Sequence, residues 1–207
     1  MVRFAPFGSG LCGGVVVGSG GESDVAQAVE WLARWLRYES RFDRGGERAV
    51  VVFDIDDTLV DPRDNKPLPA VQIYHLCAEL GFDRAIVTAR PNVRGNEAET
   101  VRMLHGLGIR DWTALHMLPA ATYATFQHAP HAGRIGTRIA EYKHQARARI
   151  AQTGQIIANI GDMWTDLMVL PVRAQWEFLL RLPAHSCCVL FPTNDEVALK
   201  LPTVPSG

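Results

Sequence analysis

The chain has 207 residues, of which 47% are hydrophobic and 21% are charged, and its formal net charge is −1. This length and composition are typical of one globular domain with a sizeable core. The near-zero charge argues against a general electrostatic attraction to nucleic acid or to a membrane surface. No stretch approaches the roughly 20 apolar residues that a membrane-spanning helix needs, and the four cysteines lack the C-x-x-C spacing of a zinc site.

The first 21 residues, MVRFAPFGSGLCGGVVVGSGG, are rich in glycine and are interrupted by Pro6. The glycines leave no apolar run as long as that of a signal peptide. We therefore predict a flexible leader over 1–21, followed by a single domain over 22–207. A cytoplasmic location is the prediction, and secretion is the alternative that remains open.

An amphipathic helix is predicted over 23–42, because apolar residues recur at Val25, Val29, Leu32 and Leu36. We expect this helix either to cover the sheet or to mediate self-association. In the second case the protein would form a homo-oligomer. It ends before a pair of glycines, and the first strand follows.

Strands and helices then alternate along the chain, which favours a mainly parallel, Rossmann-like α/β/α arrangement in three layers. Residues 61–69 and 119–133 are expected to be loops, and the Pro-rich tail from residue 192 is expected to lie on the surface. No internal repeat is visible. The pattern predicts five strands, at 49–54, 85–88, 112–118, 156–160 and 186–191, and helices at 70–80, 96–107 and 137–152.

Polar side chains follow three of these strands at the points where they end. Parallel α/β sheets bind ligands at the carboxyl ends of their strands, so these groups are expected to converge. Hard oxygen ligands without a nearby histidine or thiol suit Mg²⁺, and a cation together with a lysine would balance the acidic cluster. The residues in question are Asp54 and Asp56 after the first strand, Thr88 and Arg90 at the second, Lys143 in the helix before the fourth, and Asp162 and Asp166 after it.

The same residues resemble the motifs of the haloacid dehalogenase-like (HAD) phosphohydrolases. FDIDDT (53–58) is similar to the DxDxT motif, IVT (86–88) to the second motif, Lys143 to the third and GDMWTD (161–166) to the GDxxxD motif. TARP (88–91) and EYKHQARARIAQTGQIIANIGDMWTDL (141–167) most resemble the class B and plant-type acid phosphatases of subfamily IIIB. The resemblance covers about residues 49–192, with the four motifs in order.

This resemblance implies a HAD-like, Mg²⁺-dependent phosphomonoesterase. Asp54 would be the nucleophile that forms an aspartyl-phosphate, and Asp56 the general acid and base. Mg²⁺ would be held by the Asp54 carboxylate, the Asp56 backbone carbonyl and Asp162. The dehalogenases lack an acid at the position of Asp56, so its presence favours phosphate chemistry.

The remaining motif residues would hold the phosphoryl group or orient those that do. Thr88 and Lys143 are expected to contact phosphoryl oxygens, and Asp166 to orient Lys143 or a metal-bound water. Arg90 would add a further phosphate contact, as the arginine of the related acid phosphatases does, and a structural ion pair is the alternative for this residue.

No large cap domain is expected, because the chain has room only for a loop and a helix between Asp56 and Thr88, and residues 119–135 are expected to form a loop. The open site would accept a small phosphate monoester such as a nucleotide. A nucleic-acid-end phosphatase and a phosphotransferase are alternatives that would use the same residues. A non-catalytic storage or binding protein on this fold is a rival of another class, and the intact Asp54 weighs against it.

Overall fold

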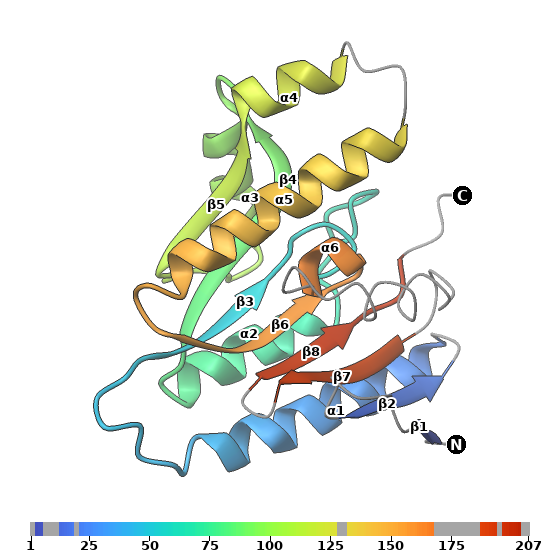
Figure 1. The fold of residues 1–207 in the computed structure, drawn as a ribbon, viewed down its shortest axis with the longest axis vertical. Helices are drawn as coiled ribbons and strands as arrows, with labels where there is room; N and C mark the ends of the chain where they lie inside the picture. Colours follow the sequence, from blue (N-terminus) through green and yellow to red (C-terminus); the bar gives the residue numbers. More distant parts are fainter. Residues whose placement is uncertain are drawn as a thin grey trace.

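The computed structural model describes residues 3–5, 13–18, 21–127, 132–167, 187–193 and 196–203. One sheet runs through these residues in the order β1-β2-β7-β8-β6-β3-β4-β5 (Figure 1). Its strands are β1 (Arg3–Ala5), β2 (Gly13–Gly18), β3 (Ala49–Phe53), β4 (Asp83–Asn92), β5 (Ala114–Pro119), β6 (Gln155–Gly161), β7 (Cys187–Thr193) and β8 (Glu196–Lys200). The helices are α1 (Glu22–Glu39), α2 (Ala70–Glu79), α3 (Asn96–Gly106), α4 (Ala120–Gln127), α5 (Ala132–Ile150) and α6 (Trp164–Leu167).

Strands β8, β6, β3, β4 and β5 pair in parallel and form the centre of the fold. The prediction of an α/β fold around a mainly parallel block of five strands is therefore confirmed. Strands β7, β2 and β1 extend this block with antiparallel pairs. The carboxyl ends of the five parallel strands share one edge of the sheet.

The core lies on both faces of the sheet, as the continuous apolar run of β3 requires. Val51 and Phe53 of β3 belong to a cluster that includes residues of α1 and α2. Val50 and Val52 point to the other face, where they pack with Ala146 and other residues of α5. Full burial of a side chain of this size contributes about 1.5–3 kcal/mol, so alternate residues of one strand fix helices above and below the sheet.

The C-terminal part of the chain differs from the prediction. The strand expected at 186–191 is β7, but it pairs antiparallel with its neighbours. The fifth parallel strand is β8, which lies in the tail that was expected to cover the surface, and the prediction for this tail is wrong. Leu199 of β8 is fully buried, so the tail is part of the core.

Parts of the predicted leader also belong to the sheet. Strands β1 and β2 lie within residues 1–21, and β2 pairs with β7 at the edge of the sheet. Residues 1–2, 6–12 and 19–20 are outside the described part of the chain. The helix predicted at 23–42 is present as α1.

The segment 119–133, expected to be irregular, contains helix α4, and α5 begins at Ala132 rather than at residue 137. Figure 1 shows α4 and the start of α5 beyond the ends of β4 and β5, and the Arg138 guanidinium donates a hydrogen bond to the Thr125 hydroxyl between them. Nothing as large as a cap domain occurs in the described residues of this region, as predicted. Among the described helices, none has the length and apolar character needed to cross a membrane.

Candidate active site

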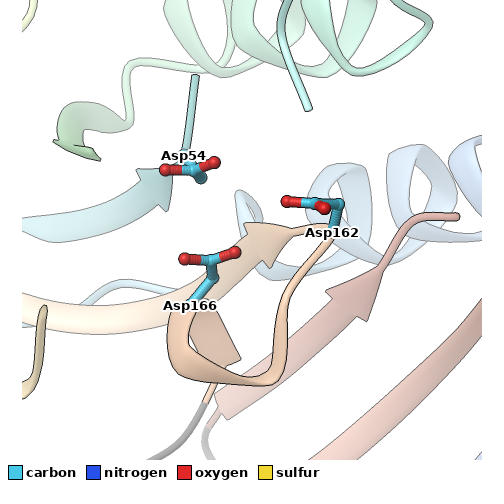
Figure 2. Close-up of side chains that lie close together, drawn as sticks. All are labelled: Asp54, Asp162 and Asp166. Atoms are coloured by element: carbon cyan, nitrogen blue, oxygen red, sulfur yellow. The ribbon is translucent and has the colours of Figure 1, made fainter. Parts of the chain in front are cut away.

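Three buried carboxyl groups meet at the carboxyl ends of β3 and β6. Asp54 follows β3 directly, Asp162 follows β6, and Asp166 lies on α6. The two strands are parallel neighbours, and the Asp54 backbone N–H donates to the Ile160 carbonyl at 3.0 Å, which holds their ends together. Figure 2 shows the three carboxyl groups facing one another, and each offers an oxygen within 4.8 Å of the others.

Lys143 of α5 connects two of these carboxylates. Its ammonium group donates to Asp54 Oδ1 at 2.8 Å and to Asp166 Oδ1. Burial by itself lowers the pKa of Lys143, but the attraction of Asp166 and Asp54 outweighs it and raises the pKa above the ordinary value. Asp166 Oδ2 accepts the Met163 backbone N–H at 3.0 Å. Both oxygens of Asp166 are thus engaged, and the residue fixes the position of Lys143.

The cluster carries more negative charge than Lys143 alone offsets. Burial, followed by the charge of Asp166, raises the pKa of Asp54 well above its usual range. Burial also raises the pKa of Asp162 to about 7. A divalent cation would relieve this repulsion, and buried carboxylate oxygens are the donors that Mg²⁺ prefers. The residues therefore fit a Mg²⁺ ion.

Asp56 lies in a second group of polar residues, with Arg90 and Thr88. The Arg90 guanidinium forms a forked ion pair with the Asp56 carboxylate, with Nη2 to Oδ1 at 2.6 Å and Nε to Oδ2 at 3.0 Å. These bonds, more than any other influence, raise the pKa of Arg90, and the charge of Asp54 also contributes. The structure shows this ion pair, and a contact of Arg90 with the substrate phosphate stays a prediction.

The backbone of β4 explains this second group. β4 continues to Asn92, beyond the predicted end at residue 88, and its pairing with β5 shifts in register between Thr88 and Pro91. The Arg90 backbone N–H donates to the Thr88 hydroxyl at 3.2 Å across this irregularity. Thr88 is fully buried, so its hydroxyl has a fixed position next to the Arg90 backbone.

Two residues that the motifs do not include hold the loop that carries Asp162 and Asp166. The buried Arg147 guanidinium donates to the Asp166 carbonyl at 2.9 Å and to the Thr165 carbonyl at 3.1–3.2 Å. The Thr203 hydroxyl donates to Asp162 Oδ2 at 3.1 Å. Arg147 could have been found, because it lies one helical turn after Lys143 on the same face of α5. Nothing in the sequence around Thr203 indicates its contact.

The seven predicted site residues are therefore placed in two groups. The first comprises Asp54, Lys143, Asp162 and Asp166, and the second comprises Asp56, Thr88 and Arg90. The Asp56 side chain belongs to the ion pair and not to the carboxylate cluster. The metal ligand predicted at this residue is its backbone carbonyl, and that prediction does not involve the side chain.

No protein-family model and no curated protein sequence matches this chain. A solved structure does: the chain is similar to the class C acid phosphatase from Bacillus anthracis, with a TM-score of 0.54 and 16% sequence identity. The match covers 86% of this chain and 75% of the phosphatase. At this identity the similarity establishes the fold alone, which is an α/β arrangement shared with the phosphatase.

Proposed function

We propose that this protein is a Mg²⁺-dependent phosphomonoesterase that works through an aspartyl-phosphate on Asp54. The observation that carries the proposal is the buried Asp54 carboxylate at the end of β3, 2.8 Å from Lys143 and within 4.8 Å of Asp162 and Asp166. A nucleophile, a cation and two further carboxylates in this arrangement suit transfer of a phosphoryl group. The acid-phosphatase fold of the similar structure agrees with it.

In the first step, an Asp54 oxygen attacks phosphorus and the bond from phosphorus to the ester oxygen breaks. The departing alcohol oxygen takes its proton from the Asp56 carboxyl group. Arg90 holds the ionised Asp56 through the forked ion pair in the free protein, so we assign it the role of positioning this residue, which takes up its proton when the phosphate monoester binds. Lys143 and the Thr88 hydroxyl bind phosphoryl oxygens, and Asp166 keeps Lys143 in place.

In the second step, Asp56 takes a proton from water, which attacks phosphorus and breaks its bond to Asp54. Inorganic phosphate leaves, Asp54 is a carboxylate again, and Asp56 has regained the proton that it gave up in the first step. Mg²⁺, when bound by Asp54, Asp162 and the Asp56 carbonyl, would supply neutralisation of the phosphoryl charge. Lys143 remains paired with Asp166 throughout, which spares the fold a buried unpaired charge.

Release of phosphate from p-nitrophenyl phosphate by the purified protein, with Mg²⁺ and with EDTA, tests the proposal. We expect turnover that requires the metal and that falls by about four orders of magnitude or more in Asp54→Asn. Asp64→Asn is the matched control, because Asp64 is a loop carboxylate that forms its ion pair with Lys66 and not with a residue of the cluster. Turnover by Asp54→Asn at the wild-type rate would overturn the proposal.

The finer assignments belong to the same proposal. Added alcohols that receive the phosphoryl group would identify a phosphotransferase, since the same residues serve both reactions. The class B and plant-type assignment rests on the sequences of 88–91 and 141–167 alone, because the similar solved structure is a class C enzyme. The cytoplasmic location also stays a prediction.

A further inference from the structure

A groove of about 1000 Å³ lies between α1 and α2, on the face of the sheet opposite α5. Its walls are apolar for most of their length, with Val25 and Val29 on α1 and Leu68, Ile73 and Leu76 at α2. Concave sites of this size and character are the usual binding sites of small molecules. None of the seven predicted site residues lines this groove.

One end of the groove reaches the candidate active site. Thr203 lines the groove and its hydroxyl donates to Asp162. Asp57 also lines it, and its charge contributes to the raised pKa of Asp162, after burial and Asp166. The groove thus meets the carboxylate cluster at Thr203.

The topology sets the direction of the groove. Both helices begin near the carboxyl edge of the sheet, because α2 follows the loop after β3 and α1 ends before β3 begins. The lining extends along α2 from Pro69 to Glu79, a length of about 15 Å at the rise of an α-helix. A chain of eight carbon atoms is shorter than this.

Charge limits what the groove can hold. Carboxylates outnumber guanidinium groups in its lining by five to two. Asp61 pairs with Arg63 of the same lining, and Glu30 pairs with Arg34, so the lining keeps a net negative charge. A negatively charged group would be repelled by this lining and would lose hydration against the apolar walls.

We infer that the groove binds the alcohol part of the substrate, and that this part is an elongated alkyl or aryl group without negative charge. The inference rests on the proposed function, since a phosphate bound at Asp54 would place the alcohol oxygen beside Asp56, and the next residue, Asp57, lines the same end of the groove as Thr203. Esters of apolar alcohols are then better substrates than nucleoside polyphosphates or nucleic-acid ends.

The test compares ethyl phosphate, octyl phosphate and a chain-matched analogue of octyl phosphate that ends in a carboxylate. We expect kcat/KM to rise about fourfold for each methylene group buried, and the terminal carboxylate to reverse this gain. Ala26 is an exposed residue of the groove lining, and Ala26→Phe should cut the octyl preference at least about tenfold. Ala98→Phe is the matched control, because Ala98 is an exposed alanine on α3.

Calorimetric titration of octyl phosphate into the Asp54→Asn protein, with and without Ala26→Phe, gives a readout that does not depend on turnover. Tight binding that Ala26→Phe weakens and Ala98→Phe does not supports the groove. Equal kcat/KM for the ethyl and octyl esters would overturn the groove inference and leave the proposed function standing. Hydrolysis of none of the esters would overturn the proposed function, and the titration would then decide the groove alone.

Discussion

Lys143 carries the charge balance of the candidate active site at the scale of single residues. Its side chain is only 4% exposed and pairs with both Asp54 and Asp166. A buried ammonium group is tolerated when it is paired in this way, and removal of one partner leaves an uncompensated charge. The lysine therefore stabilises the fold in addition to its proposed contact with the substrate phosphate.

We predict that Lys143→Met lowers the free energy of unfolding by about 3 kcal/mol, because two buried carboxylates lose their shared partner. Urea denaturation measures the change. Lys66→Met is the control, because Lys66 is an exposed residue paired with Asp64, and exposed pairs contribute about 1 kcal/mol or less. Equal stability of the wild type and Lys143→Met would contradict this account of the site.

Thr203 is a second single residue that affects the site, because its hydroxyl donates a hydrogen bond to Asp162. We predict that Thr203→Val lowers the apparent affinity for Mg²⁺ about tenfold, because a partner that orients a metal ligand typically contributes this much. The measurement is a Mg²⁺ titration of the melting temperature, which does not need turnover. Thr153→Val is the control, since the Thr153 hydroxyl donates to the Ile150 carbonyl at the end of α5. Identical Mg²⁺ dependence in both variants would show that Thr203 does not orient the ligand.

At the scale of elements, the turn from β6 into α6 determines where Asp162 and Asp166 lie. Gly161 is at this turn, and a Cβ atom there would come within 2.2 Å of Asp166 Cβ. Arg147 of α5 and the Leu201 backbone N–H, which donates to the Gly161 carbonyl at 2.8 Å, hold the turn from two sides. The turn has no room to adjust.

We predict that Gly161→Ala destabilises the protein by about 1–3 kcal/mol, as overpacking does in a dense interior, and that it reduces phosphatase activity. Gly136→Ala provides the contrast, because Gly136 lies on α5 with nothing within 4 Å of its Cβ position. Alanine is favoured in a helix by roughly 0.5–1 kcal/mol over glycine, so this variant should be at least as stable as the wild type. Thermal unfolding of the pair measures both effects.

The strands that carry the site were predictable, whereas β1, β2 and β8 at the other side of the sheet were not. β3, β4 and β6 are apolar runs that end in the motif residues, so their parallel pairing followed from the pattern. β8 is a short run, EVALK, in a Pro-containing tail, and β2 is GGVVVG. Such segments form strands because distant partners pair with them, which local propensity does not show. Thr203 was missed for the same reason.

At the scale of the whole molecule, the sheet brings together residues that are far apart in sequence. The Asp54–Lys143 and Asp56–Arg90 pairs join residues separated by 89 and 34 positions. The sequence predicts that these groups share an edge of the sheet, but the partner that each side chain chooses depends on side-chain packing. This is why the ion pair of Arg90 was only an alternative until the geometry was known.

Stability at alkaline pH tests the packing of the larger core. Burial raises the pKa of Cys77, on α2, to about 12. Because the folded state holds this proton more tightly than the unfolded chain, the stabilisation is complete below the ordinary thiol pKa and is lost as the pH rises toward the folded value. We predict that the wild type loses about 2 kcal/mol more than Cys77→Ala between about pH 9 and about pH 10.5. Parallel urea curves for the two proteins across that range would contradict the burial of Cys77.

The most direct test of the central claim is a search for the phosphoryl group on Asp54. The wild-type protein is mixed with p-nitrophenyl phosphate and Mg²⁺, quenched in acid within one turnover, digested and analysed by mass spectrometry. We predict a single phosphorylated peptide that contains Asp54. Hydroxylamine should release its phosphate, as it does from an acyl phosphate. The phosphorylated peptide should be absent from Asp54→Asn and from samples treated with EDTA. Phosphate release with no phosphorylated peptide, or with the group on another residue, would contradict the assignment of Asp54 as the nucleophile.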